Sequence, residues 1–147
     1  MAPTWILALR LLLISGGNQP ISWTPDGTTL AYQQGFDPKT WYDIYLLSLT
    51  GQHEARPLLA TKAIERLPVF SPDGEWLAYV SDESGRSEVY VRRYPAFDQP
   101  VQVTRDGGDG PAWSSDGREL FFERGQGLFT VSFTDGSTGE PRQLVSL

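Results

Sequence analysis

Three oxygen-bearing side chains hold similar places in the sequence and could act together. Each lies two or three residues before a proline, and they are Asn18, Glu65 and Asp109. Carboxylate and amide oxygens are the ligands of hard cations such as Ca²⁺, which takes about 6–8 of them. A carboxylate beside such an ion could also accept a proton from water. All three residues are therefore candidate metal ligands, and Glu65 and Asp109 are also candidate catalytic bases.

Other catalytic constellations find little support. The single histidine, His53, lies in the polar segment 50–56, and no Gly-x-Ser-x-Gly elbow accompanies it. The chain has no cysteine, so with one histidine it lacks the usual zinc ligands. The glycine-rich segment 106–110 is acidic and no helix is predicted after it, unlike loops that cradle phosphate. We interpret His53 as a solvated loop residue.

The three prolines belong to a segment that occurs three times. Each copy joins a proline, an aromatic residue and a Ser/Thr-Pro/Ser-Asp-Gly turn, at residues 20–27, 68–74 and 111–117. The aromatic residues recur after 47 and then 43 residues, at Trp23, Phe70 and Trp113. The turn aspartates are Asp26, Asp73 and Asp116. We interpret the aromatic residues as packing residues and the aspartates as turn residues that bond the backbone.

The residues after each turn predict short strands, because they form runs rich in aromatic and β-branched types. The second and third strands of the copies are expected to be joined by residues 34–42, 82–86 and 124–126. A fourth apolar segment is marked by Leu58, Val103 and Leu144. Each copy is thus predicted to be a four-stranded antiparallel meander, with the copies at residues 18–62, 63–105 and 106–147.

Four strands every 40 to 45 residues or so is the period of a β-propeller blade. The pattern Pro-x-(Trp/Phe)-Ser-Pro-Asp-Gly-x-x-Leu-Ala-Tyr, followed by an Ile/Val-Tyr strand, resembles the TolB-like, WD-repeat-like β-propeller family over residues 18–147. The third copy departs at Ser115, where the pattern has proline. The resemblance implies an all-β fold and a module that binds a protein or a ligand at a polar central channel.

The family's geometry gives the three oxygen-bearing residues a shared place. The first strand of each propeller blade lines the channel, so Asn18, Glu65 and Asp109 are expected to converge on the axis. This arrangement is similar to that of calcium-dependent lactonases, in which a channel-bound Ca²⁺ polarises the lactone carbonyl. The alternative function is therefore a small calcium-dependent hydrolase of a lactone or other ester.

Three blades cannot close a ring, because propellers generally have about 4–8. We expect a homodimer in which two half-rings complete one six-bladed propeller. Within the N-terminal segment 1–17, residues 7–14 are expected to form a strand that closes a terminal blade. The alternative is that the chain is a piece of a longer protein, since repeat arrays are stabilised by contacts between neighbours.

Composition limits the partners. The formal charge of −6 and the pI near 4.7 argue against nucleic acid and favour cations or basic partners. The apolar run 5–14 contains Arg10 and is shorter than the roughly 20 residues of a membrane-spanning helix, so no membrane insertion is expected. The run also lacks the preceding positive charge of a signal peptide, although Ser15-Gly16-Gly17 is small enough for cleavage. A weak signal-like segment is therefore the alternative for residues 1–17, and the periplasm and the cytoplasm both stay open.

Overall fold

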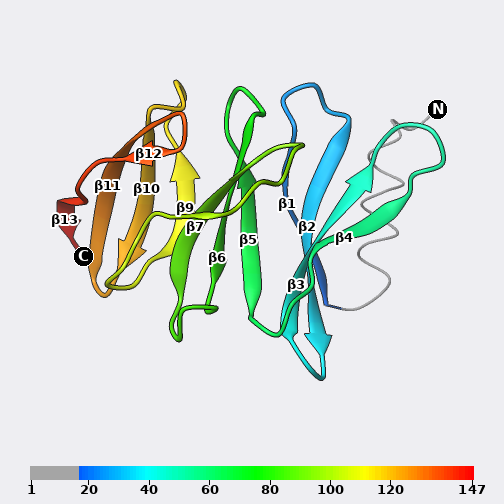
Figure 1. Cartoon of the computed structure of the whole chain (residues 1–147), viewed down its shortest axis with the longest axis horizontal. Coiled ribbons are helices and arrows are strands. Elements are labelled where there is room, and N and C mark those ends of the chain that lie inside the picture. Colours follow the sequence, from blue (N-terminus) through cyan, green and yellow to red (C-terminus); the bar gives the residue numbers. More distant parts are fainter. Residues whose placement is uncertain (1–16) are drawn as a thin grey trace.

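The computed structural model describes residues 17–147, and that part of the chain contains strands and turns but no helix. The strands form three antiparallel sheets that follow one another along the long axis of the molecule (Figure 1). The predicted all-β fold of three antiparallel blades is confirmed, and we number the blades 1 to 3 in chain order. The strand predicted within residues 7–14 lies outside the described residues.

The strands follow chain order within blades 1 and 2. Blade 1 contains β1 (Asn18–Trp23), β2 (Thr29–Asp37), β3 (Trp41–Ser48) and β4 (Ala55–Leu59). Blade 2 contains β5 (Glu65–Phe70), β6 (Trp76–Ser81), β7 (Glu88–Arg93) and β8 (Val101–Gln102). Blade 3 contains β9 (Asp109–Trp113), β10 (Glu119–Arg124), β11 (Gly127–Thr134), β12 (Ser137–Thr138) and β13 (Arg142–Ser146).

Two blades differ in detail from the predicted meander. In blade 1 most of the expected connection 34–42 belongs to strands, because the β2–β3 ladder extends to the pair Asp37 and Trp41. In blade 3 the fourth strand is divided, and β12 and β13 both pair with β11. Pro141 lies between these two strands and has no N–H to donate to a ladder.

The three Asp-Gly turns share one arrangement of hydrogen bonds. The Thr24 hydroxyl donates to the Asp26 carboxylate at 2.6 Å, which also accepts the Thr28 backbone N–H at 3.0 Å. Corresponding bonds surround Asp73 and Asp116. In Asp26 and Asp116 these bonds, above all the one from the neighbouring hydroxyl, hold the carboxyl pKa below its usual value. The turn aspartates therefore order the backbone, as the sequence indicated.

Successive turns also approach one another. A Cβ atom at Gly74 would lie 2.9 Å from Cδ of Pro25, and one at Gly117 would lie 3.6 Å from Cδ of Pro72. Both glycines have positive φ, a conformation that disfavours side chains. A Cβ atom at Gly27, in the first turn, would meet nothing within 4 Å. The proline of one turn thus contacts the glycine of the next, and the first turn has no such neighbour among the described residues.

The hydrophobic core lies between the blades. Because successive side chains of a strand point to opposite faces, Leu77 of β6 packs on blade 1 and Ala78 packs on blade 3. The cluster between blades 2 and 3 comprises Trp76, Ala78, Val89, Val91, Val103, Leu120, Phe122, Val131 and Phe133. Two clusters join blades 1 and 2, with Ala31, Leu46, Phe70 and Leu77 in one and Ile44, Leu59, Tyr79 and Tyr90 in the other.

Candidate functional site

The three predicted site residues open the inner strand of their blades. Asn18 is the first residue of β1, Glu65 of β5 and Asp109 of β9. Strand β5 contacts both β1 and β9, and the three strands run side by side through the molecule (Figure 1). Asn18 and Glu65 hold equivalent register positions, opposite Gln34 and Ser81, but Asp109 is shifted by one residue, so the three side chains do not share one face.

The register separates Asp109 from Glu65. Asp109 pairs with Glu123 of β10, and the equivalent position of β6, Val80, pairs with Arg66. Asp109 therefore corresponds to Arg66, one residue after Glu65. A shift of one residue moves a side chain to the other face of a sheet. Glu65 was expected to be the equivalent of Asp109, but in blade 2 that position is held by the basic Arg66.

Arg66 binds the Asp109 carboxylate directly. Its two terminal nitrogens donate to the two carboxylate oxygens at 2.7 and 2.6 Å, and one of them also reaches the Ser87 hydroxyl at 3.4 Å. The hydrogen bonds from Arg66 hold the pKa of Asp109 below its usual value. This ion pair joins the inner strands of blades 2 and 3. Its sequence signal was the opposite charge of the two residues that lie two places before Pro68 and Pro111.

Glu65 is buried, with 2% of its surface exposed. Its carboxyl group accepts a hydrogen bond of 2.5 Å from the Thr61 hydroxyl and one of 3.4 Å from the Thr61 backbone. Burial raises the pKa of Glu65; the hydrogen bonds from Thr61 offset part of this rise, and the nearby Asp43 and Glu83 charges add smaller contributions to it. Glu65 therefore favours its neutral form more than an exposed glutamate does.

Glu65→Gln is expected to raise the free energy of unfolding at pH 7 by about 1 kcal/mol, because the amide still accepts from Thr61 without burying a charge. The pKa of Glu65 is higher in the folded chain, so its contribution to stability falls as pH rises above about 4.5. Urea unfolding at pH 4 and pH 7, with exposed Glu140→Gln as control, measures this. A loss of stability at pH 7 would contradict the assignment.

A second buried carboxylate, Glu88, was not singled out from the sequence. Glu88 is 1% exposed, and its carboxylate accepts hydrogen bonds from the Thr104 hydroxyl at 2.5 Å and from Nε of Arg86 at 2.7 Å. The Gly107 backbone N–H donates to both carboxylate oxygens, at 3.0 and 3.1 Å. Burial alone would raise the pKa of Glu88, but these donors together lower it. Glu88 ties the glycine-rich loop to β7, and that role explains part of the loop's composition.

These partners do not suit a calcium ion. The guanidinium of Arg66 occupies both oxygens of Asp109, and Glu65 lies at a different register position with a raised pKa. Across residues 17–147, no three or more His, Cys, Asp or Glu side chains gather closely enough to hold a metal. The residues as arranged do not fit Ca²⁺, and the calcium site stays a prediction from the sequence.

His53 has a structural environment. It lies in the turn between β3 and β4, with Nδ1 3.3 Å from the backbone oxygen of Ser48. The hydroxyl of Ser48, the last residue of β3, bonds to the backbone oxygen and the hydroxyl of Thr50. Among the described residues, no hydrogen bond joins the His53 ring to a carboxylate or to a serine hydroxyl, so the geometry gives no support to serine-histidine hydrolysis.

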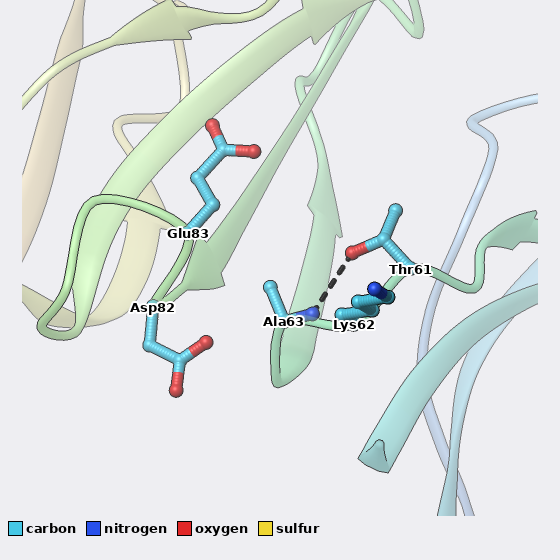
Figure 2. Close-up of a pocket in the computed structure, with 5 residues that line it drawn as sticks. All are labelled: Thr61, Lys62, Ala63, Asp82 and Glu83. Carbon is cyan, nitrogen blue, oxygen red and sulfur yellow. Dashed lines mark hydrogen bonds between the residues drawn. The ribbon is translucent and has the colours of Figure 1, made fainter. Parts of the chain in front are cut away.

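A polar hollow of about 410 Å³ lies where blade 2 begins. Asp82 and Glu83 follow β6 on one side, and Thr61, Lys62 and Ala63 of the β4–β5 connection line the other (Figure 2). The connection is ordered by two local bonds: the Ala63 N–H donates to the Thr61 hydroxyl at 3.0 Å, and the Ile64 N–H donates to Asp82 at 2.8 Å. The hollow offers two carboxylates to a ligand.

Comparison with known proteins places the chain in a family. The sequence pattern of the TolB beta propeller domain matches residues 12–146. The chain belongs to this family. The resemblance identified from the repeated Pro-Asp-Gly turns is therefore confirmed.

Solved structures of TolB share the fold. A protein described as TolB from Agrobacterium tumefaciens matches with a TM-score of 0.72 and 20% identity, over 88% of this chain and 50% of that one. TolB from Acinetobacter baumannii matches with a TM-score of 0.66 and 18% identity, over 86% and 32%. At these identities the likeness shows the fold alone.

The curated relative is much longer than this chain. Dipeptidyl-peptidase 5 of Porphyromonas gingivalis is 25% identical over 152 residues, which is 87% of this chain but 21% of the peptidase. This TolB-family chain thus spans half or less of the proteins it matches. Among the described residues, none forms a helix long and apolar enough to cross a membrane.

Proposed function

We propose that this chain is a TolB-like propeller module that binds basic segments of a protein partner at the polar hollow of blade 2. One observation carries the proposal: the hollow presents Asp82 and Glu83, whereas the carboxylates of Glu65, Glu88 and Asp109 are committed to bonds within the fold. Asp82 and Glu83 are acidic groups of the hollow that a ligand can reach.

Charge favours a basic partner. The chain carries a formal charge of −6, and the hollow contains two acidic residues and one lysine, Lys62. Attraction between this acidic chain and a basic partner raises the association rate and orients the partner, and added salt screens this attraction. Lysine or arginine side chains of an exposed segment would meet the two carboxylates.

A labelled peptide of alternating lysine and glycine is expected to bind saturably, as measured by fluorescence anisotropy, whereas its glutamate counterpart does not. Asp82→Asn together with Glu83→Gln should weaken binding about 10-fold, because both charges are lost while the Asp82 bond to Ile64 is kept. The matched control is Glu140→Gln, an exposed acid of blade 3. Equal affinity of both variants would contradict the proposed site.

Completion of the ring belongs to the same proposal. Three blades leave a propeller open, because rings generally need about 4–8 blades. A second copy would supply three more, and the two hollows would then lie on one assembly, where a partner with two basic segments gains avidity. The support for this arrangement is the count of three blades.

The alternative function, a calcium-dependent hydrolase of a lactone or other ester, is not favoured by any contact. We expect calorimetry to show no saturable heat when Ca²⁺ is added to the protein, because Arg66 holds Asp109 and the Glu65 pKa is raised. Saturable binding that Asp109→Asn abolishes, together with chelator-sensitive lactonase or esterase activity, would favour the hydrolase instead.

A further inference from the structure

Each of the two contacts between blades uses the aromatic residue that ends the inner strand. In blade 3 the indole N–H of Trp113 donates to the backbone oxygen of Val69 at 3.1 Å. In blade 2 the equivalent residue, Phe70, is buried, and its backbone N–H donates to the Ser22 hydroxyl at 3.0 Å. The residue at this position therefore docks on the inner strand of the preceding blade.

Trp23 holds the same position in blade 1, and no preceding blade lies among the described residues. Its side chain is 59% exposed, although Leu30, Tyr32 and Leu47 of the same blade form a buried cluster. The open part of this face therefore lies beside the inner strand β1. Gly27, in the turn that follows β1, lies in the same part of the molecule, and a Cβ atom there would also meet nothing within 4 Å. Blade 1 thus presents one half of a contact between blades.

The other half is present at the opposite end of the chain. Ala112 pairs with Phe121 as Val69 pairs with Ala78, so Ala112 is the Val69 of blade 3. Ala112 is exposed and, like Val69, has no side-chain hydrogen-bonding group. In the two observed contacts, Trp113 docks beside the apolar Val69, whereas Phe70 docks beside Ser22 of blade 1. The pair Trp23 and Ala112 therefore has the residue types of the observed indole-to-carbonyl contact.

We propose that Trp23 docks on strand β9 of a second copy and donates its indole N–H to the backbone oxygen of the partner's Ala112. Two such contacts, related by a twofold axis, close six blades into one ring. The inference rests on the proposed completion of the ring and names the residues that perform it.

Sedimentation equilibrium of the full chain tests this contact. The wild-type protein is expected to have twice the chain mass of 16.4 kDa. Trp23→Ala should raise the dimer dissociation constant by at least about 100-fold, because a large aromatic side chain is lost from both contacts. The control is Trp41→Ala, which removes another exposed tryptophan (63%) from the far end of β2 and β3 and should change nothing.

The outcomes separate the contact from the ring. A wild-type dimer that Trp23→Ala leaves intact overturns the docking of Trp23 but not ring completion. A wild-type monomer overturns both and assigns the surface around Trp23 to another occupant.

Discussion

Replacing Phe122 with alanine is expected to lower the free energy of unfolding by about 4 kcal/mol. Phe122 is fully buried in the cluster between blades 2 and 3, stacked on Phe129 with ring centroids 5.5 Å apart. The guanidinium of Arg124 lies 5.4 Å from the centre of its ring. Removing the ring leaves a cavity at the place where two blades meet. Guanidinium unfolding followed by tryptophan fluorescence measures the loss.

The adjacent residue supplies the matched control. Phe121 has the same side chain but points to the other face of β10, where it is half-buried beside Thr130. Phe121→Ala should cost only about 1 kcal/mol. Similar losses for the two variants would contradict the stacking of blade 3 on blade 2 through the Phe122 face.

Replacing Glu88 with glutamine is expected to lower the free energy of unfolding at pH 7 by about 3 kcal/mol. The buried carboxylate accepts from Thr104, Gly107 and Arg86, and a glutamine amide cannot accept from all of them. The loop that begins at Asp106 would lose its main anchor on β7. Proteolysis within this loop and urea unfolding both report the change.

The pH dependence distinguishes Glu88 from Glu65. The pKa of Glu88 is lower in the folded chain, so the stability that its charge supplies is present above about pH 4.5 and lost as pH falls through the folded value. Glu88→Gln should therefore matter more at pH 7 than at pH 3, whereas Glu65→Gln should stabilise at pH 7. If both substitutions shifted stability in the same direction at pH 7, the two carboxylates would have been assigned wrongly.

The fold could be predicted because its signals are local. The turn residues, the aromatic spacing of Trp23, Phe70 and Trp113, and the alternation after each turn all reflect contacts within one copy. The exceptions arise where pairing extends past the apolar residues. Polar residues of segment 34–42 continue the β2–β3 ladder, because backbone groups pair regardless of side-chain polarity.

The site could not be predicted because it depends on register and on distant partners. A bulge between Arg66 and Val69 sets which face each side chain of β5 occupies. Leu67, within the bulge, has a positive φ that no rule for leucine suggests, and its N–H donates to the Gln33 side chain at 2.9 Å. Asp109 meets Arg66 from 43 residues away. Spacing from a proline cannot reveal either relation.

Small-angle X-ray scattering of the full chain tests the completed ring most directly. Two copies closed into one compact ring predict twice the 16.4 kDa chain mass and a radius of gyration of about 19 Å. A single chain predicts about 15 Å. Scattering with the mass of one chain, or a dimer whose radius of gyration is well above 20 Å or so because the copies join end to end, would contradict the ring.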